Sequence, residues 1–301
     1  VLLSVGKDSV YIWENDETMM HENDAAEVLY RMTANEHMHP SDVKEGKIEA
    51  IADTEGLLKV DREKLKKVNA FGEMMIATRH GNTVVKKGDK LAGTRIIPLV
   101  IKKDKMQEAE KICDGTPILK ILPFTVKKAA IITTGNEVYH GRIKDAFTPV
   151  IEQKIAEFGA EMMFHEIFDD NDRKITDGCL RAIEAGADIV FCTGGMSVDP
   201  DDKTPLAIKN TGAEMISYGS PVLPGAMFLL SYYRKGDKVI PICGLPGCAM
   251  YNRRTIFDLV LPRLMAADPV TADELASLGE GGLCLNCKVC TFPNCGFGKG
   301  W

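Results

Sequence analysis

The sequence predicts an α/β protein in which a mostly parallel sheet, over residues 128–267, follows a smaller and partly β-rich α+β domain over residues 1–127. Two observations predict this class. In the second half, apolar strand-like runs alternate with helix-like segments, as is typical of βαβ units. In the first half, short strand-like segments separated by turns share the chain with a few charged helical stretches. Residues 268–301 read as a linker and a cysteine-rich tail.

The totals narrow the class further. The chain has 301 residues and 45% apolar content, enough for two domains with a real core. A net charge of -6 argues against nucleic acid as the main partner. No apolar run reaches the length of a membrane span and no signal peptide is visible, so we expect no membrane partner and a cytoplasmic protein. The chain starts with a strand-like run, Val1-Leu-Leu-Ser-Val5, and not with Met, so we expect a fragment whose native N-terminus is missing.

The first half contains candidate elements but no motif that predicts chemistry. A helix is expected from His21 to Met32, capped by Asn23 or Asp24, and capping explains the polar residues there better than ligand contact does. Further along the chain we expect a charged helix at 61–68, strands at 74–78 and 82–86 around a turn at His80-Gly81, a strand at 95–101, and an exposed helix at 102–111.

The second half alternates regularly. Strands are expected at 129–133, 161–168 and 188–192, followed by a hairpin of 227–233 with 238–243. Helices are expected from Thr148, as cap, to Phe158, then around Ile175, Cys179 and Ile183, then after a Thr204 cap with Pro205 as first residue, and finally from Cys248 to Leu261, where Pro262 should end or kink it.

The loop from Thr193 to Pro205 is the most informative segment. Gly194 and Gly195 follow a buried strand, so backbone amides can approach a ligand closely there, and the next helix N-terminus favours an anion. The acids of this loop, Asp199, Asp201 and Asp202, suit a metal–phosphate ligand. The alternative is a solvated acidic turn. We favour the ligand site because glycines, acids and a helix cap coincide where open α/β sheets bind ligands.

Three other loops follow strands of the same sheet: Thr133-Thr-Gly-Asn-Glu137, Asp169-Asp-Asn-Asp172 and Gly244-Leu-Pro-Gly-Cys248. In a doubly wound sheet such loops collect at one edge. Together with Ser197 and the acids Glu137, Asp169, Asp170 and Asp202 they suit a phosphorylated ligand with Mg²⁺. A helix N-terminus rich in acids explains residues 169–172 at least as well as catalysis does.

The order of these motifs resembles the molybdopterin-binding domain shared by molybdopterin adenylyltransferases and molybdenum insertases. The resemblance covers about 128–267 and rests on Thr134-Gly-Asn-Glu137, Gly141, Ile143, Asp169-Asp170, Thr193-Gly-Gly-Met-Ser197, Asp202-Lys-Thr-Pro205, Pro224-Gly-Ala226 and Gly244-Leu-Pro-Gly247. It implies a three-layer α/β/α fold that binds a pterin phosphate at the carboxyl edge of the strands. It also implies a homo-oligomer, because relatives form dimers or trimers.

Carried over by position, the resemblance implies a cofactor-binding set and a catalytic set. The residues that would bind the pterin phosphate are Thr134, Gly135, Glu137, Gly194, Gly195, Ser197, Thr204, Pro224, Gly225, Gly244, Pro246 and Gly247. Asp202 would be the essential acid, with Asp169 or Asp170 as the second. Two positions depart from the family: Cys248 and Phe147 stand where Asn is usual. The first half also lacks the Ser-Ala-Met-Asp-Gly-type segment of an ordinary insertase.

The tail carries Cys284, Cys287, Cys290 and Cys295 in a C-x2-C-x2-C-x4-C spacing, with glycines on either side. Four thiolates so close can surround one metal centre. The first three resemble a ferredoxin [4Fe–4S] loop, although the last gap is longer and Pro293 precedes the fourth cysteine. Tetrathiolate zinc is the alternative.

The other five cysteines are scattered, as in a reduced cytosolic protein. We expect the tail to be a tethered appendage that contacts a partner redox enzyme.

The sequence thus predicts a cytoplasmic enzyme of molybdenum cofactor biosynthesis, similar to the molybdenum insertases. It would act as a molybdopterin molybdotransferase that joins molybdate to molybdopterin, or to its adenylylated form, with Mg²⁺ on the phosphate. Mg-ATP-dependent adenylylation of molybdopterin is one alternative. A non-catalytic carrier or sensor that docks on a molybdoenzyme is another, and a pyrophosphate-cleaving relative is a third. A shared fold does not choose among them.

Overall fold

A computed structural model describes residues 16–197 and 199–300, and the strand-like run expected at Val1–Val5 lies outside this range. The chain divides into two compact units. One contains the described residues up to Thr54, with Lys59–Arg79 and Lys86–Ile121. The other contains Glu55–Leu58, His80–Val85 and the described residues from Leu122 on. No helix of the described residues is long and apolar enough to cross a membrane.

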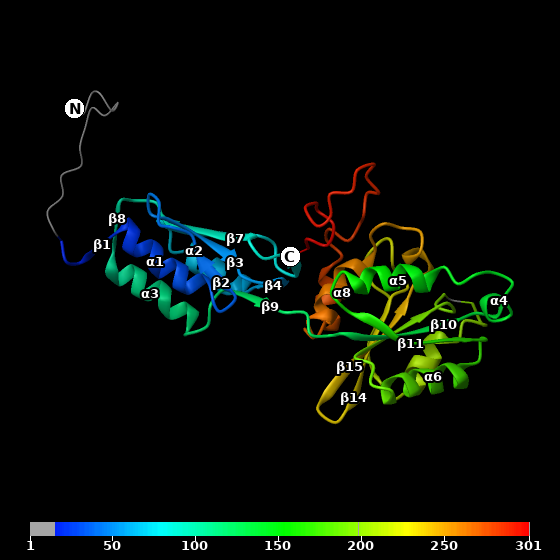
Figure 1. The fold of residues 1–301 in the computed structure, drawn as a ribbon. Helices are drawn as coiled ribbons and strands as arrows, with labels where there is room; N and C mark the ends of the chain where they lie inside the picture. Colours follow the sequence, from blue (N-terminus) through cyan, green and yellow to red (C-terminus); the bar gives the residue numbers. More distant parts are fainter. Residues whose placement is uncertain (1–15, 198, 301) are drawn as a thin grey trace. The chain divides into compact units, whose positions relative to one another are not determined.

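The N-terminal part is α+β. Its strands form a two-stranded sheet β1-β8, a four-stranded sheet β2-β3-β7-β5 and a three-stranded sheet β6-β4-β9. Their bounds are β1 Met19–His21, β2 Met38–Pro40, β3 Lys47–Ala52, β4 Gly56–Val60, β5 Met74–Thr78, β6 Thr83–Val85, β7 Lys90–Ile96, β8 Val100–Lys102 and β9 Leu119–Leu122. The helices are α1 Glu22–Thr33, α2 Arg62–Asn69 and α3 Lys103–Cys113 (Figure 1).

Several expectations for this part need correction. Strands β5 and β6 lie on either side of His80-Gly81 as expected, but they do not pair with each other, because β5 pairs with β7 and β6 pairs with β4. The strand expected at 95–101 is split between β7 and β8. The cap of α1 is His21, whose Nδ1 accepts the amide of Asn23 at 3.3 Å. Helix α3 is not wholly exposed, since Met106, Ala109 and Cys113 are buried.

The second unit is built on a six-stranded sheet of order β11-β10-β12-β15-β14-β13. Its strands are β10 Lys128–Thr134, β11 Glu161–Phe168, β12 Ile189–Thr193, β13 Glu214–Tyr218, β14 Leu229–Lys235 and β15 Lys238–Leu245. The pairs β10–β11, β10–β12 and β12–β15 are parallel, and only β14 runs against the others. The mostly parallel α/β sheet is confirmed. The edge strand β13 was not expected from the sequence.

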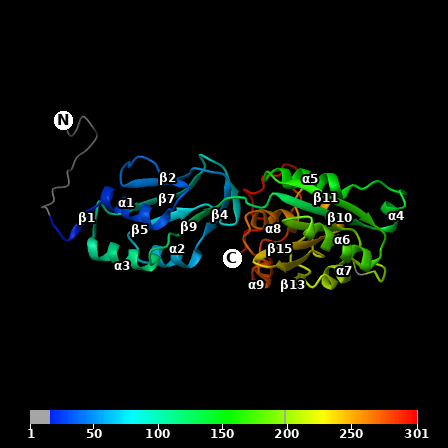
Figure 2. The same ribbon diagram turned by 60° about the horizontal axis from the view of Figure 1, so that its bottom comes forward.

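Helices cover both faces of this sheet. They are α4 Asn136–Tyr139, α5 Phe147–Ala156, α6 Asp172–Glu184, α7 Thr204–Asn210, α8 Ile256–Met265 and α9 Ala272–Ser277. One core joins strand residues such as Ile131 and Phe191 to α5 and α8, and the other joins Ile132 and Cys192 to α6 and α7. Successive strand residues therefore face opposite cores, and the unit has three layers, as Figures 1 and 2 show.

The helix bounds depart from expectation at three places. Helix α5 begins at Phe147, with Thr148 inside it, because Asp145 accepts the amides of Phe147 and Thr148. Thr204 is the first residue of α7 and not its cap. Helix α8, which was expected to begin at Cys248, begins at Ile256 after a capping box formed by Thr255 and Asp258, and it continues through Pro262. Residues Gly247–Ala249 form only a 3-10 turn.

Candidate functional site at the carboxyl edge of the sheet

The predicted ligand loops meet at one edge of the six-stranded sheet. Cross-strand register places Thr134 beside Phe168, Thr133 beside Thr193, and Thr193 beside Leu245, so β10, β11, β12 and β15 end together. Antiparallel β14 begins there, with Leu229 opposite Gly244 and Tyr218. The loop of Pro224 and Gly225, between β13 and β14, therefore belongs to the same edge. This is where ligands bind in open α/β sheets.

Buried threonines hold the Gly194-Gly195 loop. Thr134 lies 3% exposed at the end of β10, and its hydroxyl donates to the Thr193 carbonyl at 3.1 Å. The Thr204 hydroxyl donates to the Gly194 carbonyl at 2.8 Å and lies 3.0 Å from Thr134 Oγ1. These hydrogen bonds tie β10, the loop and α7 together. The two threonines predicted to bind cofactor thus fix the shape of the loop through their side chains.

The glycines of the edge fall into two groups. At Gly194 and Gly225 a Cβ atom would lie 2.1 and 2.4 Å from Thr134 O and Ile256 Cγ2, so packing requires glycine there. At Gly244 it would lie 2.4 Å from Cε at the flexible end of Met196, so that side chain would have to move. Gly195 is similar, at 2.9 Å from Thr204 Oγ1. Gly135 and Gly247 instead have no neighbour within 4 Å of that position. These two leave room for a ligand to approach the backbone.

The acids stand around this edge without forming a cluster. Asp170 accepts the Asn136 amide at 3.1 Å, which joins the 169–172 loop to the Thr134-Gly-Asn-Glu loop. Asp169 pairs with Lys174 at 2.8 Å. Asp202 is partly buried, and Ser197 and Glu137 are exposed. Across residues 16–197 and 199–300, no three His, Cys, Asp or Glu side chains stand close enough together to hold a metal ion.

Two polar atoms at the strand ends have no partner. Asp169 Oδ1 and Thr193 Oγ1 are both buried and make no hydrogen bond within the described residues. An unsatisfied buried polar atom costs about 1–3 kcal/mol and is rare in native proteins. Asp169 follows β11 and Thr193 is the last residue of β12, and these two strands lie on either side of β10. A bound polar ligand or water at this edge would supply the missing partners.

A buried network behind β10 escaped the sequence analysis. Asp145 Oδ2 accepts the hydroxyls of Thr148 at 2.5 Å and Thr133 at 3.0 Å, and His165 Nε2 lies 3.5 Å from it. Burial raises the pKa of Asp145, but hydrogen bonds from Thr148, Thr133 and the Phe147 amide together lower it below its usual value. The only signal in the sequence is that Asp145 stands two residues before α5, and an acid at that position is ordinarily interpreted as a helix cap.

Tyr218 also escaped the sequence analysis. It ends β13, and its hydroxyl donates to the carbonyls of Met196 at 3.1 Å and Ser197 at 3.3 Å. Partial burial and the nearby charge of Asp202 raise the pKa of Tyr218. The phenol therefore fastens the loop that carries the predicted catalytic acid. Finding it required β13, which the sequence did not reveal.

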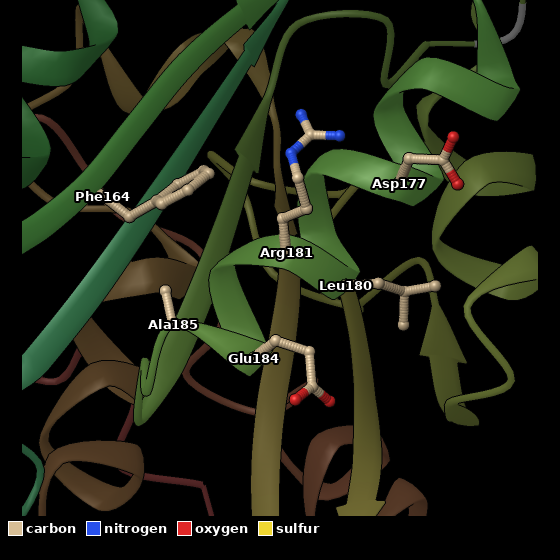
Figure 3. A pocket seen from close by; sticks show the side chains of 6 residues that line it. All are labelled: Phe164, Asp177, Leu180, Arg181, Glu184 and Ala185. Carbon is tan, nitrogen blue, oxygen red and sulfur yellow. The ribbon is translucent and has the colours of Figure 1, made fainter.

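A separate hollow of ≈ 600 Å³ lies between β11 and α6. Figure 3 shows its lining, in which Phe164 comes from β11 and Asp177, Leu180, Arg181, Glu184 and Ala185 come from α6 and its end. Arg181 pairs with Glu166 and lies 5.9 Å from the Phe168 ring. None of the predicted site residues lines this hollow, so it is distinct from the ligand edge.

The four tail cysteines are free thiols, with Cys287 and Cys290 exposed and Cys284 and Cys295 partly buried. The tail is not a loose appendage. Cys284 and Cys295 pack against the α5–α8 core, and Phe297 lies within that core, 5% exposed. The prediction of a tethered tail is therefore wrong for the two ends of the cysteine segment. Phe297 and the glycines around it allow the backbone to pack directly against the domain.

Comparison with known protein families agrees with the interpretation of these loops. Residues 130–266 match the family model described as "Probable molybdopterin binding domain", which confirms the resemblance drawn from the motifs. A "Putative competence-damage inducible protein" of Bacillus cereus strain B4264 is 30% identical over 129 residues, or 43% of this chain and 30% of the relative. Its counterpart in Bacillus subtilis strain 168 is 32% identical over 85 residues, or 28% and 20%. The chain thus spans less than a third of these relatives.

Solved structures with detectable likeness are more distant. The tungsten cofactor synthesizing protein MoaB from Pyrococcus furiosus is 18% identical, with a TM-score of 0.40, over 48% of this chain and 98% of that one. The molybdopterin biosynthesis moeA protein from Pyrococcus horikoshii OT3 is 16% identical, with a TM-score of 0.33, over 60% of this chain and 42% of that one.

Proposed function

We propose, from the molybdopterin-binding domain that residues 130–266 form, that the protein acts in molybdenum cofactor biosynthesis as a molybdopterin molybdotransferase. Its substrates would be molybdate and adenylylated molybdopterin. In the proposed reaction molybdate joins the dithiolene of the pterin and AMP is released. The site is the carboxyl edge of the six-stranded sheet.

One observation carries this proposal. The buried ends of β11 and β12 present Asp169 Oδ1 and Thr193 Oγ1 without partners, beside the open backbone at Gly135 and Gly247. An unpaired carboxylate oxygen and an unpaired hydroxyl, next to glycines with open space beside their backbone, suit a ligand with polar ring atoms and a phosphate. An adenylylated pterin is such a ligand. The edge is rigid because strand ladders and buried threonines already hold the loops.

Asp202 and Asp170 are the proposed protein ligands of Mg²⁺. Although the acids do not converge as a triplet in the described residues, Mg²⁺ commonly binds one or two carboxylates and completes its shell with substrate phosphates and water. The bound ion would neutralise charge on the nucleotide phosphate. Asp170 already contacts the Asn136 amide, and Tyr218 holds the loop of Asp202, so both carboxylates are attached to fixed parts of the edge.

The test is an anaerobic assay with adenylylated molybdopterin, Mg²⁺ and molybdate that follows AMP release. Molybdate-dependent release supports the proposal, and tungstate in place of molybdate reports metal preference. Consumption of ATP on molybdopterin without molybdate would support an adenylyltransferase instead. Tight pterin binding without turnover would support a carrier that docks on a molybdoenzyme. Light scattering of the same sample tests the proposed homo-oligomer.

A substitution pair tests the role of Asp202. Asp202→Asn should abolish AMP release and leave the unfolding midpoint unchanged, because the residue is only partly buried in a surface loop. Asp201→Asn is the matched control, since Asp201 is its exposed neighbour in the same loop. Equal activity of the two variants would remove Asp202 from the mechanism.

A further inference from the structure

The C-terminal tail, residues 279–300, has no helix or strand of its own and yet is attached closely to the domain. Leu223 and Leu283 form a parallel bridge, in which the Leu223 amide donates to Gly282 O and the Cys284 amide to Leu223 O, both at 2.8 Å. Gly298 lies so near Leu259 that a Cβ would stand 2.3 Å from Cδ2. Both ends of the cysteine segment are therefore fixed.

The middle of the tail differs from its ends. Leu285 and Val289 are 77% and 76% exposed, and Cys287 and Cys290 are exposed beside them. Ordering one residue costs about 1–2 kcal/mol of backbone entropy, and this loop buries almost no apolar side chain to offset that cost. Small segments without a core are usually held by a cross-link or a metal.

Positive charge surrounds the same loop. The Arg254 guanidinium lies 4.8 Å from the Phe292 ring centroid and pairs with Asp258 at 2.8 Å. Arg253 Nη1 donates to Lys288 O at 3.3 Å. Four thiolates around Zn²⁺ or around a [4Fe–4S]²⁺ core leave a net charge of about −2, and Arg253 is the arginine beside the loop that could offset part of it, because Arg254 already pairs with Asp258.

We propose that Cys284, Cys287, Cys290 and Cys295 bind one thiophilic metal centre that closes the loop between the two fixed cysteines. On binding of Zn²⁺ or of a preassembled [4Fe–4S]²⁺ cluster, four thiol protons are released and four sulfur–metal bonds form, with no change in oxidation state. The sulfurs do not stand in a metal-binding arrangement in the described residues, so the exposed cysteines must move inward while Cys284 and Cys295 stay on the core. The site is independent of the pterin chemistry.

The experiment is elemental analysis of the full chain purified anaerobically, followed by removal of metal with a chelator and titration with Zn²⁺ or with sulfide and equal amounts of Fe²⁺ and Fe³⁺. The expected result is one zinc or four irons per chain, and the two are distinguished by sulfur-to-iron absorption in the visible region. Four fewer cysteines should react with a thiol reagent than in the stripped protein.

Substitutions separate this site from the rest of the chain. Cys287→Ser with Cys290→Ser should lose bound metal at least tenfold without unfolding, because both side chains are exposed. Cys113→Ala, at a buried cysteine of the other unit, is the control and should keep full metal content. Metal retained in the double serine variant would overturn the proposal. So would a stripped protein with intact thiols that takes up neither zinc nor iron–sulfide.

Discussion

The carboxyl edge of the sheet and the cysteine tail both depend on glycine, but for different reasons. At the edge, Gly194 adopts φ +83° with Thr134 O directly against its Cα, inside a network of strand ladders and buried hydroxyls. In the tail, Gly298 adopts φ +72° against the flexible side chain of Leu259, and a short bridge and the packing of Phe297 tie the ends of the segment to the domain. The edge is therefore held by its own fold, whereas the tail needs a further constraint.

The largest effect should come from Gly194→Ala. A Cβ would lie 2.1 Å from Thr134 O at a positive φ, and strand backbone cannot move aside. Strain and overpacking together should lower the free energy of unfolding by about 2–5 kcal/mol. Gly236→Ala, in the β14–β15 turn at φ +60° with open space around it, should cost only about 1 kcal/mol. Urea unfolding measures both, and equal losses would show that crowding at the edge is unimportant.

The threonine network should come next. Thr204→Val removes the donor to Gly194 O and the contact with Thr134 Oγ1 while keeping the side-chain shape. Leaving buried polar groups unpaired costs about 1–3 kcal/mol. Thr291→Val, in the exposed tail, should change stability by less than about 0.5 kcal/mol. A neutral Thr204→Val would mean that the strand ladders alone fix the loop.

The glycine loop and the cysteine tail both stand out in the sequence because their signals are local. Gly194-Gly195 after a buried strand and four closely spaced cysteines can each be read within a dozen residues. The mostly parallel sheet followed from alternating strands and helices, and its three layers were implied by the resemblance to the molybdopterin-binding domain. Pairing was harder: β5 joins β7 and not β6, since register between distant strands depends on packing that no local pattern records.

The parts of the site that were missed depend on distant contacts. Asp145 reads as a helix cap until β11 brings His165 to within 3.5 Å of it. Tyr218 is one more aromatic residue until β13 ends beside the Met196-Ser197 backbone. Conversely, Gly225 and Gly244 read as ligand glycines, yet Ile256 and Met196 occupy the space beside them. A motif indicates which residues matter but not whether packing or a ligand requires them.

A substitution in the tail should change hydrogen exchange only near the tail. Gly298→Ala forces Leu259 aside and should loosen the base of the tail, at a cost of about 1–2 kcal/mol because a side chain can rotate where a strand cannot. Hydrogen exchange should speed up at the Cys284 and Gly298 amides, which bond to Leu223 O and Gly281 O, and stay unchanged in β10 and β12. Gly296→Ala, with no atom within 4 Å, is the control. Faster exchange across the sheet as well would show that the tail is part of the core.

The smallest effect should be the pH dependence of Asp145→Asn. The amide keeps the shape and can still accept the backbone bonds, so the substitution removes mainly the charge that the Thr148 and Thr133 hydroxyls stabilise. Because the folded pKa lies below the unfolded value of about 3.9, the carboxylate stabilises the fold above about pH 4. That contribution is lost as the pH falls through the folded pKa. The variant should therefore be less stable than the parent by about 1 kcal/mol at pH 7, and the difference in stability should close toward pH 3.

Asp237→Asn, in the exposed β14–β15 turn, is the control, and urea midpoints at pH 7, 5 and 3 give the comparison. A gap that stays constant over this range would assign the network a role in shape alone. The charge at the edge would then be unimportant to its stability, and the contrast with the tail, where charge is proposed to hold the metal, would be sharper.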